Sequence, residues 1–395
     1  MTDPAGALLA RARRLQREAP LVDGHNDLAW ELRERAAGEL GRMDPGGPLP
    51  ELHTDLPRLK AGGVGAQFWA AFVPFTEPSP LRATLEQIDL IRRMTERAPE
   101  LEVAWTAEEV ERIHGQGRIA SLVGVEGGHA IENSLGVLRQ FRRLGVRYLT
   151  LTHGSTIDWA DASTDEARHG GLSPFGEEVV REMNRLGMLV DLSHVSADAA
   201  RTALRVTEAP VVFSHSSAQA VADHPRNVPD DVLETVRSNR GVVMVTFYSA
   251  FVHPQGAELM RDMFEVQRRF QAQHPDDPHA AHEAYEAWRT ASQIPRGSVA
   301  LLADHVDHIA RVAGIDHVGI GSDFDGVTLL PEGMEDVSCY PNLTAELLAR
   351  GYTDDEVKKV LGENVLRVMR EVDRVAERLQ RERGPSTATI RELDG

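Results

Sequence analysis

Five residues of the kinds that bind metal ions stand at or near the ends of short apolar runs. They are His25, Asp27, Glu126, His194 and His215. Imidazole and carboxylate groups are the usual ligands of Zn²⁺ and similar divalent ions. His25 and Asp27 are two positions apart, a spacing that places both side chains on one face of a β-strand. His194 and His215 each follow a serine at the end of consecutive runs. The set therefore indicates a metal site.

The number of ligands bears on the kind of metal site. Five ligands are too many for one tetrahedral Zn²⁺, but they fit two ions that share a carboxylate, with Glu126 as the bridge. Two ions roughly 3.5–4 Å apart hold a hydroxide between them at neutral pH and polarise a carbonyl. This chemistry favours hydrolysis of an amide or ester by attack of that hydroxide. For each residue alone, a hydrogen-bonded core histidine or a capping acid is the alternative.

Such a hydrolysis also needs a proton carrier and a group that stabilises the carbonyl oxygen. Asp323 ends the last apolar run and could pass a proton from the water to the leaving amine. Asp325 competes for this role, or is a turn residue before Gly326. His153 could stabilise the oxyanion, with a third metal ligand or a core histidine as its alternatives.

Two further residues are candidates for binding the substrate. Arg226 lies in the loop after the sixth run, where a guanidinium could bind a carboxylate through two parallel hydrogen bonds. An ordinary surface arginine is the alternative for this residue. Tyr248 follows the seventh run and could contribute a hydroxyl group.

Eight apolar runs must position these residues, and each has the composition of a buried β-strand. Near-continuous Val, Ile, Leu and Phe is typical of parallel strands that are covered on both faces. The runs are Pro20–His25, Val64–Val73, Arg118–Glu126, Val146–Thr152, Met188–Ser193, Pro210–Ser214, Gly241–Phe247 and His317–Ser322. Amphipathic helical stretches such as Leu81–Glu96 separate them. The alternation predicts an α/β fold, a (β/α)8 TIM barrel with its site at the C-terminal ends of the strands.

Three segments extend this repeating pattern. Residues 251–296 are longer than a barrel connection needs, and they predict a helical excursion between strands seven and eight. Residues 354–379 predict a C-terminal helical tail, and residues 381–395 a frayed end. The whole chain, residues 1–395, is expected to form one domain.

The composition limits the partners and the compartment. The 395 residues carry a net charge of −18, which argues against nucleic acid and against anionic membrane surfaces. The single cysteine, Cys339, excludes an intrachain disulfide and fits a reducing compartment. No run is long enough to span a bilayer, and the first twenty residues lack the apolar segment of a signal peptide. We expect a cytoplasmic protein with neither nucleic-acid nor membrane partners.

Taken together, the motifs resemble those of the membrane (renal) dipeptidase family, within the metal-dependent amidohydrolase barrels. In chain order they are Val22-Asp23-Gly24-His25-Asn26-Asp27, Gly124-Val125-Glu126-Gly127-Gly128-His129, Leu149-Thr150-Leu151-Thr152-His153, Val190-Asp191-Leu192-Ser193-His194, Ser214-His215-Ser216 and Gly321-Ser322-Asp323-Phe324-Asp325-Gly326. The resemblance implies a binuclear zinc dipeptidase with two Zn²⁺ per chain, which accepts dipeptides with an L or a D residue at the C-terminal side.

The resemblance also implies a role for each residue. His25 and Asp27 would bind one zinc, His194 and His215 would bind the other, and Glu126 would bridge the two. Asp323 would act as the acid/base. His153 would contact the scissile carbonyl, and Arg226 would bind the substrate carboxylate. An amidohydrolase of another small amide, such as an N-acyl amino acid or a cyclic amide, is the first alternative. A non-catalytic metal-binding protein is the second. The assembly is left open, with a homodimer as one option.

Overall fold

The computed structural model describes residues 4–275 and 277–395, and a closed barrel of eight parallel strands forms its centre. The barrel strands are β1 (Leu21–Asn26), β2 (Val64–Phe72), β4 (Ile119–Glu126), β5 (Val146–Thr150), β6 (Leu189–Asp191), β7 (Val212–Phe213), β8 (Val242–Val245) and β9 (Val318–Ile320). Pairing of β2 with β4, for example Ala66 with Ala120, closes the ring. The predicted TIM barrel is confirmed, and every barrel strand falls within its predicted run to within one residue.

A ninth strand, β3 (Leu101–Val103), is absent from the sequence prediction. It pairs with β4 at Ile119–Ser121, whereas β5 pairs with β4 from Val123 onward. Since β2 occupies the opposite edge of β4, strands β3 and β5 share one edge, and β3 extends the sheet only at the base of the barrel. Three residues, the last of them exposed, are too few to form a recognisable apolar run.

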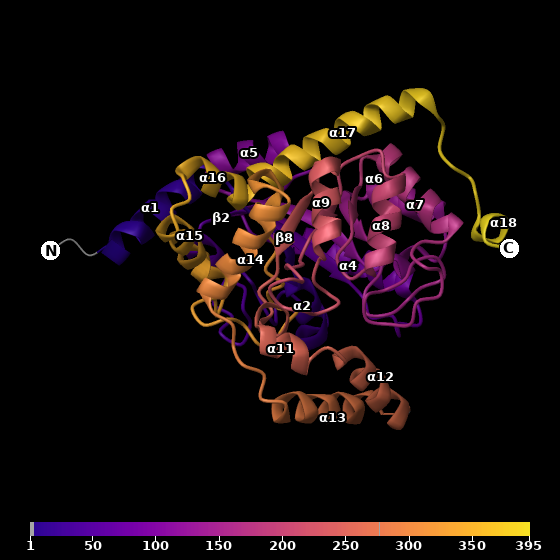
Figure 1. Ribbon diagram of the computed structural model, residues 1–395, viewed down its shortest axis with the longest axis horizontal. Coiled ribbons are helices and arrows are strands. Elements are labelled where there is room, and N and C mark those ends of the chain that lie inside the picture. The colour runs from indigo at the N-terminus through magenta and orange to yellow at the C-terminus, as the bar shows by residue number, and fades with distance from the viewer. Residues whose placement is uncertain (1–3, 276) are drawn as a thin grey trace.

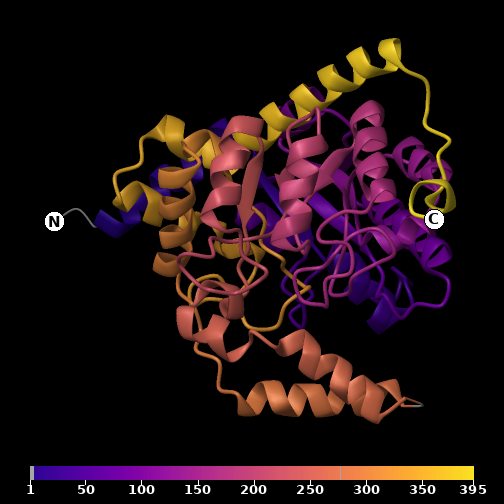
Figure 2. The ribbon, with the colours of Figure 1, turned by 45° about the vertical axis from the view of Figure 1, so that its right-hand side comes forward.

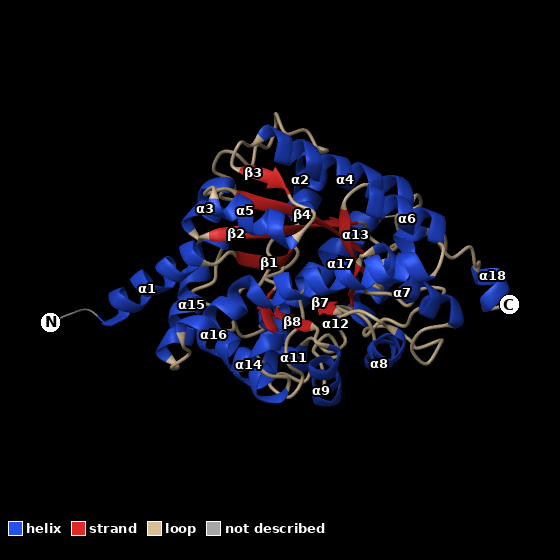
Figure 3. Cartoon of the chain, turned by 90° about the horizontal axis from the view of Figure 1, so that it is seen from above, coloured by secondary structure: helices blue, strands red, loops and turns tan. Residues whose placement is uncertain are grey.

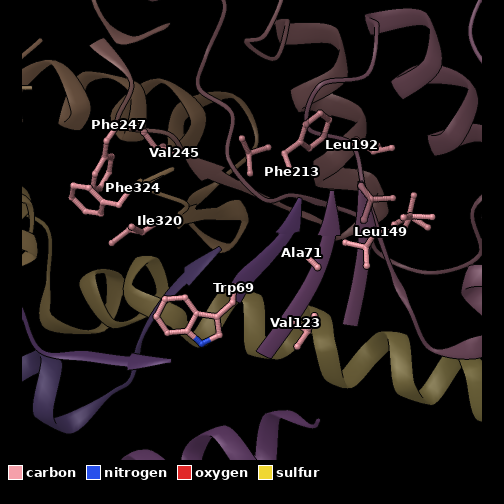
Figure 4. Close-up of a cluster of buried hydrophobic side chains, with 14 of the residues drawn as sticks. Trp69, Ala71, Val123, Leu149, Leu192, Phe213, Val245, Phe247, Ile320 and Phe324 are labelled. Carbon is pink, nitrogen blue, oxygen red and sulfur yellow. The ribbon is translucent and has the colours of Figure 1, made fainter. Parts of the chain in front are cut away.

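Helices surround the barrel on its outside (Figure 3). They are α1 (Pro4–Glu18), α2 (Leu28–Ala36), α3 (Leu56–Ala61), α4 (Pro80–Arg97), α5 (Ala107–Gly115), α6 (Leu135–Arg143), α7 (Pro174–Leu186), α8 (Ala197–Val206), α9 (Asp230–Asn239), α14 (Val299–Val312) and α15 (Tyr340–Ala349). Apolar side chains from strands such as β2 and β8 lie in the continuous core shown in Figure 4, where Trp69, Val245 and Phe324 are labelled. Within the described residues, no helix combines the length and the apolarity needed to cross a bilayer.

The predicted helical tail closes the base of the barrel. It consists of α16 (Asp354–Lys358), a π-helical turn at Lys359–Glu363 and α17 (Asn364–Glu382). Leu366 and Met369 of α17 pack in one buried cluster with Phe68 and Met244 of the strands. Burying one such side chain contributes about 1.5–3 kcal/mol. Helix α17 lies across one end of the barrel in Figure 1, and the helical excursion lies at the other.

The helical excursion between β8 and β9 comprises α10 (Ser249–Val252), α11 (Pro254–Leu259), α12 (Met263–Gln273) and α13 (Pro278–Ala291). Helices α12 and α13 pack side by side and project from the barrel, as Figure 2 shows. Tyr248, Phe251 and Met263 join the excursion to the end of β8 in a small apolar cluster of their own. The excursion therefore lies over the C-terminal ends of the strands.

The C-terminal end differs from the predicted frayed tail. After α17 the chain runs back to α7 and forms α18 (Ile390–Leu393). Asp394 accepts hydrogen bonds from the Ser173 hydroxyl at 2.6 Å and from the Phe175 amide at 2.9 Å, both at the start of α7. These polar contacts bridge residues far apart in the chain, so hydrophobic periodicity gives no sign of them.

Candidate metal centre

A cavity of about 490 Å³ opens at the C-terminal ends of the barrel strands. This volume lies within the usual range for small-molecule sites. Five parts of the chain line it: the strand ends (Asp27, Glu126, His153, His194, Asp323), helix α2 (Trp30, Glu31, Arg35), the loop before α3 (Glu51, Leu52, His53), the excursion (Met263, Phe264, Gln267, Tyr285, Glu286, Arg289) and the loop after β9 (Asp325, Gly326, Val327, Thr328). The cavity is therefore where a barrel of this kind is expected to hold its site.

The five predicted metal ligands lie close together at this cavity: Asp27, Glu126 and His194 line it, and His25 and His215 are buried beside them. Nε2 of His25 lies 3.1 Å from Oδ2 of Asp27 and 3.6 Å from Oε2 of Glu126. Oε1 of Glu126 lies 3.1 Å from Nε2 of His194 and 3.3 Å from Nε2 of His215. Glu126 thus presents one carboxylate oxygen to each pair of predicted ligands.

The residues present fit divalent metal ions. Three overlapping sets of ligand atoms lie within 4.8 Å of one another: His25–Glu126–His215, Glu126–His153–His194 and His25–Asp27–Asp323. Nε2 of His25 and Oδ1 of Asp27 are buried without a hydrogen-bond partner among the described residues; the 3.1 Å approach of Nε2 to Oδ2 of Asp27 lacks hydrogen-bond geometry. An unsatisfied buried polar atom costs about 1–3 kcal/mol, and a cation would give both atoms a partner.

Tyr148 fixes the orientation and tautomer of His25. The Tyr148 hydroxyl donates its proton to the carbonyl oxygen of Gly24 at 3.2 Å. Its oxygen must then accept from Nδ1–H of His25, which lies 2.9 Å away. A neutral His25 therefore keeps the lone pair of Nε2 for a metal ion.

Ser214 and Asp191 fix the orientation and tautomer of His215. The Ser214 hydroxyl donates to Oδ2 of Asp191 at 2.6 Å, and its oxygen accepts from Nδ1–H of His215 at 2.7 Å. Asp191 is held in turn by the Thr150 hydroxyl at 2.6 Å. The lone pair of Nε2 of His215 consequently faces the Glu126 carboxylate and the cavity floor.

These supporting residues are missing from the sequence prediction, although two signals for them exist. Asp191 is a charged residue within an apolar run, and such a residue must be paired when buried. Gly124 of β4 leaves room for the Tyr148 ring, since a Cβ at Gly124 would lie 1.9 Å from Cζ of Tyr148. The sequence contains the glycine, but the ring that needs the space lies on another strand.

Removal of the Tyr148 hydroxyl should weaken metal binding. Tyr148→Phe keeps the ring but leaves His25 free to adopt the other tautomer, so we expect metal affinity to fall roughly 10–100-fold. Competition with a chelating dye, and the absorption spectrum of the Co²⁺-loaded protein, would measure the change. Tyr340→Phe is the matched control because its hydroxyl is equally buried but bonds to Asp23 at 2.6 Å. Equal affinity losses in both variants would exclude a specific role for Tyr148.

The electrostatics of the cluster also favour a cation. Burial raises the pKa of the Glu126 and Asp323 carboxyl groups, and the nearby charge of Asp27 raises them further. Burial alone would lower the pKa of His25, but Asp27 and Glu126 raise it to about 10. Three carboxyl groups in one buried cluster leave it short of positive charge, which bound divalent ions would supply.

His153 and Tyr248 also line the cavity. The His153 ring lies 4.8 Å from the Phe72 ring and 4.3 Å from the His194 ring, centroid to centroid. Removal of His153 from water, together with the charge of Arg226, lowers its pKa to about 3, so it is neutral near pH 7. Burial raises the pKa of Tyr248, which therefore keeps its phenolic proton.

Arg226 is brought close to the metal ligands but is not among the described residues that line this cavity. It is buried and lines a smaller neighbouring cavity of about 170 Å³. Its guanidinium donates to the carbonyl oxygen of His215 at 3.1 Å and to the Ser216 hydroxyl at 3.2 Å. Burial lowers its pKa to about 10, so the group remains a cation at neutral pH.

Three residues around the cavity adopt backbone conformations that side chains other than glycine rarely take. The φ angles are 66° at His194, 69° at Asp323 and 65° at Asp325. Such left-handed residues cost on the order of 1 kcal/mol each and often mark functional sites. Asp323 belongs to a set of potential metal ligands, whereas Oδ1 of Asp325 accepts from the His53 amide at 2.6 Å. This arrangement favours Asp323 over Asp325 as the proton carrier.

Comparison with known proteins extends over nearly the whole chain. The sequence profile of the family described as membrane dipeptidase (peptidase family M19) matches residues 9–383. Dipeptidase verJ of Clonostachys rogersoniana is 41% identical over 386 residues, which cover 94% of this chain and 89% of that protein.

Two solved structures are also similar. The probable dipeptidase PvdM from Pseudomonas aeruginosa superposes with a TM-score of 0.80 at 26% identity, covering 94% of this chain and 99% of that one. A metallo peptidase from Rhodobacter sphaeroides, liganded with a phosphinate mimic of the dipeptide L-Ala-D-Ala, superposes with a TM-score of 0.73 at 27% identity. The match covers 90% of this chain and 99% of that one.

Proposed function

The chain belongs to the membrane dipeptidase family, and from this premise we propose that it hydrolyses dipeptides at a centre of two zinc ions. Its family and relatives make it a metal-dependent hydrolase of peptide bonds. The observation that carries the proposal is the position of Glu126, with one oxygen directed at His25 and the other at His194 and His215.

In this proposal the ligands divide into two pairs. His25 and Asp27 would hold one ion, His194 and His215 the other, and Glu126 would contact both. When bound, such ions lower the pKa of water and polarise a carbonyl oxygen. Tyr148 and Ser214 keep the imidazoles of His25 and His215 in the orientation that this binding requires.

Asp323 and His153 would handle the proton and the developing charge. The raised pKa of Asp323 suits a carboxyl group that takes a proton from the attacking water and gives it to the leaving amine. His153 stays neutral, so its ring N–H can donate to the carbonyl oxygen as negative charge develops there. A donor in this position typically contributes about 10²–10³-fold in rate.

Arg226 would bind the C-terminal carboxylate of the dipeptide. Two of the five N–H donors of its guanidinium make hydrogen bonds to described residues, and Nε is buried without a partner. Contact with the carboxylate instead of the side chain would allow either configuration at the C-terminal residue. The phosphinate mimic of L-Ala-D-Ala bound to the Rhodobacter sphaeroides relative supports this tolerance.

A substrate panel with an Arg226 variant tests the proposed function. The zinc-loaded protein should cleave L-Ala-L-Ala and L-Ala-D-Ala but should be much slower on N-acetyl-L-alanine and on a cyclic amide. Arg226→Met should raise KM for both dipeptides by about 30-fold or more, because loss of a buried charged contact costs about 2–5 kcal/mol.

The zinc content of Arg226→Met should equal that of the wild type. Preferred cleavage of the cyclic amide by the wild-type protein would contradict the dipeptidase proposal. An unchanged KM in Arg226→Met would contradict only the role of Arg226.

A further inference from the structure

His53 is a cavity residue that the proposed reaction leaves without a role. It lies in the loop between α2 and α3, and its side chain is 27% exposed at the cavity wall. Its backbone amide donates to Oδ1 of Asp325 at 2.6 Å, and its carbonyl accepts from the Val337 amide at 3.2 Å. The ring also lies against that of Phe324, with centroids 5.9 Å apart. The imidazole is therefore held in place on several sides.

One hydrogen bond determines which ring nitrogen of His53 carries the proton. The backbone amide of Asp325 can only donate, and it donates to Nδ1 of His53 at 3.0 Å. Nδ1 therefore has no proton in the neutral ring, and Nε2 has one. Burial and the charge of Arg58 lower the pKa of His53 to about 4, which keeps the ring neutral. Among the described residues, none is hydrogen-bonded to Nε2–H.

Arg226 contacts the ligand cluster next to His215, whereas His53 contacts it next to Asp27. Arg226 is bonded to the carbonyl of His215. His53 is bonded to Asp325, whose neighbour Gly326 is so close to Asp27 that a Cβ there would lie 2.2 Å from Oδ2 of Asp27. A dipeptide whose carboxylate binds at Arg226 would therefore direct its N-terminal residue toward Asp27 and His53.

We propose that Nε2–H of His53 donates a hydrogen bond to an oxygen atom in the side chain of the substrate's N-terminal residue, and so favours residues such as glutamine over apolar residues of similar size. The inference rests on the proposed dipeptidase function. A neutral donor suits a neutral acceptor oxygen. The two arginines among the described residues that line the cavity are already paired, Arg35 with Glu31 and Arg289 with Glu286. One such bond is expected to change relative affinity roughly three- to tenfold.

The test compares L-Gln-L-Ala with L-Met-L-Ala, whose N-terminal side chains have similar length. The wild-type zinc enzyme should show kcat/KM higher for the glutamine dipeptide by about three- to tenfold. Calorimetry with the two corresponding phosphinate dipeptide analogues should give the same ratio in Kd, independently of turnover.

Two substitutions separate substrate binding from a structural role. His53→Gln can place a donor near the position of Nε2 but lacks Nδ1, so it should keep the glutamine preference. His53→Asn can place an acceptor near the position of Nδ1 but does not reach the cavity, so its ratio should fall to about one.

Three results would overturn the inference. A wild-type ratio near one would overturn the inference about His53 and leave the dipeptidase proposal intact. A glutamine preference that is retained in His53→Asn but lost in His53→Gln would have the same consequence. Failure of the wild-type enzyme to cleave either dipeptide would remove the dipeptidase proposal and the inference with it.

Discussion

Replacement of Asp323 by asparagine should lower kcat for dipeptides by about 10²–10⁴-fold, the usual contribution of a positioned acid or base. The substitution nearly keeps the size of the side chain and leaves it able to form hydrogen bonds, but it removes the ionisable carboxyl group that takes up and releases a proton. Asparagine also tolerates the left-handed backbone, with φ of 69°, that this position requires. The zinc content should remain that of the wild type, because Asp323 is not among the five proposed ligands. Initial rates and metal analysis on the same preparation would measure both effects.

Asp325→Asn is the matched control for this substitution. Asp325 lies two positions along the chain, is also 8% exposed and has a φ of 65°. Oδ1 of Asp325 accepts a hydrogen bond from the His53 amide, and Asp325 belongs to none of the sets of potential metal ligands found among the described residues, so we expect a much smaller change in kcat. If Asp325→Asn loses as much activity as Asp323→Asn, the proton carrier has been assigned to the wrong aspartate or is shared between the two.

Replacement of Glu126 by glutamine should have the largest effect, because one residue serves both proposed ions. The amide has a single ligand oxygen and no charge, so it cannot bridge two cations. We expect less than two zinc ions per chain and a loss of activity on the order of 10³-fold or more. Metal analysis after dialysis, together with the rate on L-Ala-L-Ala, would check both expectations.

In the metal-free protein, the same substitution is expected to preserve or raise stability, although it lowers activity and metal content in the zinc-loaded protein. Burial raises the pKa of this carboxyl above its value in the unfolded chain. Its charged form therefore opposes folding, and stability increases as the pH falls through the folded-state pKa. Metal-free Glu126→Gln should consequently have a Tm equal to or above that of the metal-free wild type near pH 7.

Glu182→Gln provides a control at a buried glutamate outside the site. Glu182 is paired with Arg185 at 2.7 Å and with Arg139 at 3.2 Å. We expect this variant to lower Tm and to leave the metal content unchanged. A lower Tm of metal-free Glu126→Gln than of the metal-free wild type would indicate that Glu126 stabilises the fold even without metal. That result would contradict the expectation that its buried charge opposes folding.

The sequence predicts the barrel and its metal residues because both depend on local patterns. A strand that is buried on both faces is apolar over its length, so a terminal His194 or His215 is conspicuous. Parallel strands in a barrel place their C-terminal ends together, which is why residues from β1, β4, β6 and β7 could be grouped before their distances were known.

The remaining features depend on contacts between distant segments. Tyr148 orients His25 from another strand, and His53 reaches the cavity through a loop anchored to Asp325. Arg226 could be placed near the site from its loop, but its hydrogen bonds to His215 and Ser216 and its direction depend on packing. The position of α18 likewise rests on the contacts of Asp394 with the start of α7, which no local pattern reveals.

The central claim is that Glu126 joins two metal sites, and the number of zinc ions per folded chain tests it most directly. The wild-type protein should be stripped with a chelator, reloaded with Zn²⁺, freed of excess metal and analysed by mass spectrometry against a protein concentration from amino-acid analysis. We predict two equivalents per chain, with activity reaching its maximum only as the second binds. A single equivalent with full dipeptidase activity would contradict the shared-carboxylate centre.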